Sequence, residues 1–89
     1  MLFALNCLDK PGSLPIRLEN RPAHLDYLNG SGSVVFAGPY IEADKPVGSL
    51  VVIEVADRAA AEAFAAADPY AKAGLFETVT LREWRKVIG

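Results

Sequence analysis

Gly48 to Val55 constrains the fold more than any other segment, because it has the features of a strand that is apolar on both faces. Its β-branched residues fit a pleated surface. Val51 and Ile53 would face one side of a sheet. Leu50 and Val52 would face the other side. Such a strand needs a cover on each face, so it belongs inside a sheet that is packed on both sides.

Turn signals and periodicity divide the rest of the chain into further elements. The predicted elements, in chain order, are a strand at Leu2–Leu8, a helix at Leu14–Leu28, a strand at Ser33–Ala37, the strand at Gly48–Val55, a helix at Arg58–Ala67 and a strand at Phe76–Trp84. Gly38-Pro39 should stop the second strand, and Ile41–Val47 should form a polar hairpin connection. With right-handed crossovers, the β-α-β-β-α-β order predicts an α+β, ferredoxin-like fold. It has a four-stranded antiparallel sheet with two helices on one face.

The first helix carries two features that predict its shape. Leucines recur at a spacing that would keep one helical face buried, and they are Leu14, Leu18, Leu25 and Leu28. Pro22 interrupts this pattern, so we expect a kink or two helical pieces instead of one straight rod.

The second helix has clear signals at both ends. Asp57 is expected to cap its amino end, since aspartate is a preferred N-cap residue. Asp68 and Pro69 should break it, because a residue before proline avoids the α region. The same pair suits a new short turn, with Asp68 as the cap and Pro69 in the first position. Gly74 would close that turn.

Length and composition favour one small domain that associates with itself. The 89 residues form a single domain over 1–89, and 52% of them are hydrophobic. A domain of this size buries only roughly 60–65% of its unfolded surface. Two helices cover only one face of the sheet, so we expect a second copy to cover the other face, giving a homodimer through the open sheet face.

Charge and hydropathy argue against several classes of partner. The formal net charge of −2 does not suit a nucleic-acid binder, which needs a basic face. No apolar run approaches the ~20 residues that span a bilayer, so no membrane association is predicted. Met1–Leu5 lacks the basic region of a signal peptide, and Cys7 is the single cysteine, which excludes an internal disulfide. A cytoplasmic location is therefore expected.

His24 and Asp68 are the candidate catalytic residues. His24 is the only histidine, and an imidazole can exchange protons near neutral pH. Asp68 could orient it, since the N-cap role uses only one acceptor direction of the carboxylate. Each residue also has a plain structural role, as a helix histidine and as a cap, and spacing alone does not show that they meet. No second histidine or cysteine stands at ligand spacing, so neither a metal nor a cofactor is indicated.

The candidate substrate-binding residues flank the first helix and the two central strands. Arg17 and Arg21 lie one helical turn apart and could clamp a carboxylate, although solvated arginines are common on helices. Other candidates are glycines and polar residues at strand ends and an aromatic residue of the short turn, namely Gly38, Pro39, Ser49 and Tyr70. Turn formation is the alternative role of Gly38 and Pro39. Ser49 suits hydrogen bonding better than nucleophilic attack, since no base is assignable to it.

The spacing of several short motifs resembles the YCII-related family of small bacterial proteins. The matching pieces are Arg21, His24-Leu25, Tyr27-Leu28, Ala37-Gly38-Pro39, Gly48-Ser49-Leu50, Asp68-Pro69-Tyr70, Ala73-Gly74-Leu75 and Trp84. They extend over almost the whole chain, and their order and spacing are more specific than any one of them.

This resemblance implies a ferredoxin-like dimer of the dimeric α/β barrel type, similar in architecture to muconolactone isomerase-type enzymes. It also implies a His–Asp active site at the positions of His24 and Asp68. We therefore expect an enzyme that transfers a proton, in an isomerase or lyase-type elimination, on a small anionic or cyclic organic molecule. The alternative is a non-catalytic ligand-binding or regulatory dimer module.

Overall fold

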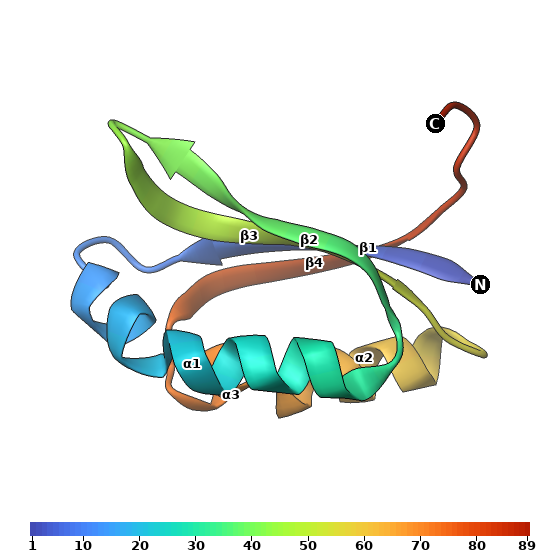
Figure 1. Cartoon of the computed structure of the whole chain (residues 1–89), viewed down its shortest axis with the longest axis horizontal. Helices are drawn as coiled ribbons and strands as arrows, with labels where there is room; N and C mark the ends of the chain where they lie inside the picture. Colours follow the sequence, from blue (N-terminus) through green and yellow to red (C-terminus); the bar gives the residue numbers. More distant parts are fainter.

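The computed structural model describes all 89 residues and shows one antiparallel sheet with three helices on one side (Figure 1). In chain order the elements are β1 (Leu2–Asp9), α1 (Leu14–Ser31), β2 (Val34–Glu42), β3 (Lys45–Glu54), α2 (Arg58–Ala67), α3 (Pro69–Lys72) and β4 (Phe76–Trp84). The strands lie in the order β2-β3-β1-β4. This is the ferredoxin-like α+β topology, so the predicted fold class is confirmed.

The register of β3 on β1 confirms that β3 is apolar on both faces. Leu5 pairs with Val51 and Ala4 pairs with Val52, so the two pairs point to opposite sides of the sheet. Val51 and Val52 are each 2% exposed. The side that faces the helices carries the main hydrophobic core, which consists of Phe3, Leu5, Cys7, Leu28, Val51, Ile53 and Ala61.

The hairpin between β2 and β3 is longer than predicted. The two strands continue to Glu42 and from Lys45, so Gly38-Pro39 does not end β2 and Ile41–Val47 is not a polar connection. β2 is an edge strand, and an edge strand tolerates proline because one side of it needs no ladder hydrogen bonds. The turn itself is only Ala43 and Asp44, which both adopt positive φ values, of 49° and 63°.

α1 is a single helix with Pro22 inside it, and its first turns bend away from the axis of the rest (Figure 1). The predicted buried leucine face is wrong in part, because Leu18 is 56% exposed and Leu25 is 36% exposed. The residues that α1 buries are Arg17, His24 and Leu28. The helix therefore presents polar side chains to the sheet, and the space beneath it is not filled by aliphatic packing. None of the helices is long and apolar enough to cross a membrane.

Both aspartate caps are confirmed. Asp57 accepts a hydrogen bond from the Ala60 amide at 2.8 Å, at the start of α2. Asp68 ends α2 and begins α3, where its carboxylate accepts from the Tyr70 amide at 2.9 Å. α3 is a separate four-residue helix, which makes the short turn predicted after Pro69 slightly longer than a turn. It brings Tyr70 under α1.

The opposite face of the sheet has no helix over it (Figure 1). Phe36 on β2 and Trp84 on β4 meet edge to face above it, with ring centroids 6.0 Å apart. The hydroxyl of Tyr40 donates a hydrogen bond to the side chain of Asn6 on the same face. We call this side the open face.

Candidate functional site

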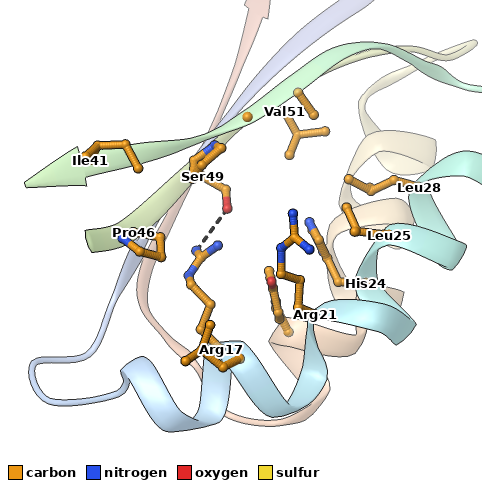
Figure 2. Close-up of a pocket in the computed structure, with 14 residues that line it drawn as sticks. Arg17, Arg21, His24, Leu25, Leu28, Ile41, Pro46, Ser49 and Val51 are labelled. Atoms are coloured by element: carbon orange, nitrogen blue, oxygen red, sulfur yellow. Dashed lines mark hydrogen bonds between the residues drawn. The ribbon is translucent and has the colours of Figure 1, made fainter. Parts of the chain in front are cut away.

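A cavity of about 400 Å³ lies between α1 and the β2–β3 half of the sheet (Figure 2). Every predicted substrate-binding residue lines it, as does His24. The lining residues are Arg17, Leu18, Arg21, His24, Leu25, Leu28, Ala37, Gly38, Pro39, Ile41, Pro46, Ser49, Val51 and Tyr70. Asp68 is not among them, although it is in contact with His24. The structure thus gathers the predicted site residues around one cavity.

His24 and Asp68 are in direct contact. The Nδ1 atom of His24 lies 2.9 Å from Oδ1 and 3.1 Å from Oδ2 of Asp68. The two residues are 6% and 5% exposed. Since Asp68 is an acceptor, the imidazole tautomer that satisfies this contact carries its proton on Nδ1. Nε2 makes no hydrogen bond within the protein and belongs to a side chain that lines the cavity.

The Tyr70 ring holds His24 on one face and Arg17 on the other. The imidazole stacks on it with centroids 3.9 Å apart and planes at 14°. The Arg17 guanidinium carbon lies 4.6 Å from the same centroid. Because the stacked imidazole fills one face of the ring, the guanidinium must occupy the opposite face. Tyr70 is 1% exposed, so the stack is packed inside the protein.

Arg17 does not reach freely into the cavity as a carboxylate clamp. Its Nε donates to Asp9 Oδ2 at 2.7 Å and its Nη2 donates to Asp9 Oδ1 at 2.9 Å. The same Nη2 donates to Ser49 Oγ at 2.9 Å (Figure 2). Burial alone would lower the pKa of Arg17, but the Asp9 carboxylate outweighs it and holds the pKa above its ordinary value. Arg17 therefore remains a fixed cation, with its charge already balanced.

Arg21 is the arginine whose positive charge is available to a ligand. Its side chain is exposed and has no ion-pair partner in the protein. Figure 2 shows Arg21 beside His24, with both side chains reaching from α1 toward the sheet. The predicted pair of clamping arginines thus divides into a structural cation, Arg17, and an unpaired cation, Arg21.

Tyr70 keeps its hydroxyl proton in this environment. Burial raises its pKa above the ordinary value, and the nearby charges of Arg17 and Arg21 only partly oppose that effect. Two aromatic residues of the motifs that match the family, Tyr27 and Trp84, lie elsewhere. Tyr27 donates to the Phe64 carbonyl at 2.8 Å, and Trp84 lies on the open face.

Asp9 is the site residue that sequence reasoning missed. It ends β1, two residues before Pro11-Gly12. A short turn joins β1 to α1, and Arg17 stands one turn into that helix. An acidic residue before such a turn and a basic residue soon after it form the signal that would have indicated the pair. No group of three or more His, Cys, Asp or Glu side chains is arranged to hold a metal ion.

Solved structures share this fold and one of them shares substantial sequence. The 5-chloro-2-hydroxyhydroquinone dehydrochlorinase (TftG) from Burkholderia phenoliruptrix AC1100, in complex with 2,5-dihydroxybenzoquinone, superposes with a TM-score of 0.90. It is 33% identical over 96% of this chain and 94% of that chain. An antibiotic biosynthesis monooxygenase, at a TM-score of 0.58 and 17% identity over 97% of this chain and 100% of that chain, shows the fold alone.

Sequence relatives cover nearly the whole chain. Protein YciI from Escherichia coli O6:H1 is 38% identical over 98% of this chain and 99% of its own length. An uncharacterized protein from Haemophilus influenzae is 31% identical over the same shares. The family model of the YCII-related domain matches residues 1–85. Together with the fold, these matches show that the chain belongs to the YCII-related family.

Proposed function

We propose that this protein is an acid–base enzyme in which His24 moves a proton on a small, oxygenated cyclic substrate, in an isomerisation or an elimination. The observation that carries this proposal is the arrangement of the imidazole. Its Nδ1 contacts Asp68 at 2.9 Å, and its Nε2 has no protein partner beside a cavity of about 400 Å³. A general base needs this combination of a fixed ring and a free nitrogen.

Asp68 supports the proton transfer in two ways. Its hydrogen bond fixes the tautomer in which Nε2 carries a lone pair. When Nε2 accepts a proton, the imidazolium forms beside a carboxylate, which stabilises its charge. Asp68 is itself held by the Tyr70 amide at 2.9 Å, so the pair needs no rearrangement during the reaction.

The cavity suits a flat ring that carries acidic oxygens. Half of its 14 lining residues are hydrophobic, which suits the faces of a ring. Arg21 supplies an unpaired positive charge, and Ser49 supplies a hydroxyl. The name of the dehydrochlorinase from Burkholderia and the quinone bound to it support a hydroxylated six-membered ring as the substrate class here.

The proposed chemical step is balanced by the groups in the cavity. Nε2 of His24 accepts a proton from a hydroxyl or a carbon of the ring. The electron pair of that bond moves into the ring, and a ring π pair takes the proton back from Nε2 at another ring carbon, which completes an isomerisation. In an elimination that carbon bears the leaving group, which departs with its bonding pair as an anion while a second ring hydroxyl loses its proton and becomes a carbonyl. Negative charge that develops on a ring oxygen is stabilised by Ser49 and Arg21.

The test is turnover of chlorinated hydroxyhydroquinones, followed as chloride release. His24→Gln should lower kcat by about 10²–10⁴-fold, since it removes the general base. Asp68→Asn should cause a smaller loss, because asparagine still caps α3 and still accepts from Nδ1 but does not stabilise an imidazolium. Tyr27→Phe is the matched control, since Tyr27 lies outside the cavity. Wild-type turnover in His24→Gln would refute the proton-transfer role.

A ligand-binding module remains the second candidate function. The apolar half of the cavity lining would hold a ring whether or not a reaction follows. Wild-type protein that binds hydroxyquinones and releases them unchanged would favour this second function.

A further inference from the structure

We propose that Asp9 and Arg17 are positioning residues that make Ser49 a hydrogen-bond donor to an ionised or carbonyl oxygen of the substrate. The inference rests on the proposed function only in placing the substrate in the cavity. It adds a polarity to that site: the Ser49 proton points away from Arg17 and is offered to a substrate oxygen.

The polarity follows from the hydrogen bonds that Arg17 makes. A guanidinium only donates, so the contact of Nη2 with Ser49 Oγ at 2.9 Å occupies a lone pair of the serine oxygen. The hydroxyl proton cannot point back at Arg17. Ser49 is 3% exposed and lines the cavity, so its proton has the cavity as its open direction.

The guanidinium cannot turn away to release Ser49. Asp9 holds it through two hydrogen bonds, of 2.7 Å and 2.9 Å, in the bidentate geometry that fixes an arginine plane. The Tyr70 ring lies 4.6 Å below its carbon. Asp9 comes from the end of β1, Arg17 from α1 and Ser49 from β3. Three elements thus fix the orientation of the Ser49 hydroxyl.

The position of this hydroxyl relative to His24 defines which oxygen it recognises. Arg17 and His24 stack on opposite faces of Tyr70, so Ser49 and the imidazole bound the cavity from different sides. A ring whose proton is removed at His24 would place another oxygen, at a different ring position, against Ser49. That oxygen is the one on which negative charge accumulates, and a donor of fixed direction favours its ionised form over a protonated hydroxyl or an ether.

The experiment is a double-mutant cycle on binding of 2,5-dihydroxybenzoquinone, measured by isothermal titration calorimetry with each variant checked by circular dichroism. Ser49→Ala should weaken binding about 10- to 100-fold, as expected for a hydrogen bond to a charged group. Asp9→Asn should weaken it about tenfold in wild type and have no effect in the Ser49→Ala background. A merely structural role of Asp9 would instead give the same loss in both backgrounds.

Asp9→Asn leaves a buried arginine partly unpaired and could unfold the chain. The second variant therefore replaces both partners, as Asp9→Leu with Arg17→Met, which removes the buried charge and keeps apolar volume. We expect it to fold and to bind the quinone as weakly as Ser49→Ala does. We also expect its preference for the ionised quinone over 2,5-dimethoxybenzoquinone to be about tenfold smaller than that of the wild type, since Arg21 stays in place.

Additive losses in the cycle would overturn the inference, and so would wild-type protein that binds the quinone no better than Ser49→Ala. A preference for the ionised quinone as large in the double replacement as in the wild type would overturn it as well. The cycle measures binding and involves no turnover. A failure of the proton-transfer role, seen in His24→Gln kinetics, is therefore distinguishable from a failure of this inference.

Discussion

Cys7 shows how strongly the interior beneath the cavity disfavours charge. It lies in β1 opposite Ser49 and is 4% exposed. Burial, and after it the negative charge of Asp68, raises the pKa of the Cys7 thiol from 9.0 to about 12, although Arg17 acts in the opposite direction. The thiol is therefore a neutral core group and not a nucleophile.

This thiol makes stability fall with pH in a defined window. Its folded pKa lies above its unfolded value, so its contribution is complete below pH 9 and is lost as the pH rises toward 12. We expect the wild type to lose about 1.4 kcal/mol of unfolding free energy per pH unit more than Cys7→Ala does in this window. Urea unfolding at pH 8, 9.5 and 10.5 measures the difference. Parallel pH dependences in the two proteins would contradict the buried neutral thiol.

Single residues also show why the site was only partly predictable from sequence. Asp68 was identifiable, because a residue that both ends one helix and caps the next has a known local geometry and a spare acceptor. Its contact with His24 across 44 positions depends on how α1 and α3 pack, which spacing does not encode. Asp9 was missed for the same reason, since its role depends on the burial of Arg17 on a helix that the leucine pattern oriented differently.

At the scale of elements, β3 lies so close to β1 at Gly48 that a side chain would not fit there. A Cβ atom built there would meet the Cys7 backbone carbonyl at an impossible separation and the Tyr40 ring at 3.2 Å. The absence of a side chain thus lets the two strands pair beside Ser49. Gly48 was predicted as a strand-end glycine, and its use is in this close backbone approach.

Gly48→Ala should therefore destabilise the fold by roughly 1–3 kcal/mol, the usual cost of overpacking against backbone. Gly30→Ala is the matched control, because its Cβ meets nothing within 4 Å and it lies inside α1. That substitution should stabilise by about 0.5–1 kcal/mol through helix propensity. Thermal and urea unfolding compare the two proteins. Equal stabilities would show that β3 can move away from β1 without cost.

The elements themselves were predictable where local chemistry decides them. The bounds of α2 and β4 match the prediction because caps and breakers stand at their ends. β2 was predicted too short because Gly38-Pro39 has the composition of a turn, and only its place at the sheet edge makes proline acceptable there. The turn at Ala43-Asp44 lacks the Asn-Gly or Asp-Gly signature, so pattern alone did not locate it.

For the whole molecule, the open face sets the expectation about assembly. All three helices lie on the other side of the sheet (Figure 1), while Phe36 is 45% exposed and Trp84 is 38% exposed. An apolar face of this kind in so small a domain favours burial against an identical face, in an isologous dimer. The order of elements predicted the fold, but nothing in a single chain tests the dimer, and it stays a prediction.

We expect wild-type protein to sediment as a dimer and Phe36→Glu to sediment as a monomer, since the substitution would bury two unpaired carboxylates in the interface. Val87→Glu is the control, because Val87 is 85% exposed beyond β4. Sedimentation equilibrium at several protein concentrations measures both. A dimer that survives Phe36→Glu would place the contact on another surface.

The unequal burial around the cavity also bears on how such a protein can diversify. Tyr70 and Asp68 are 1% and 5% exposed, whereas Leu18 and Ile41 at the rim are each 56% exposed. Substituting a rim side chain should change the free energy of unfolding little, whereas substituting Tyr70 or Asp68 should lower it substantially. Homologous proteins can therefore diverge in the ligands they accept through substitutions at the exposed rim, while the buried residues beneath it are retained.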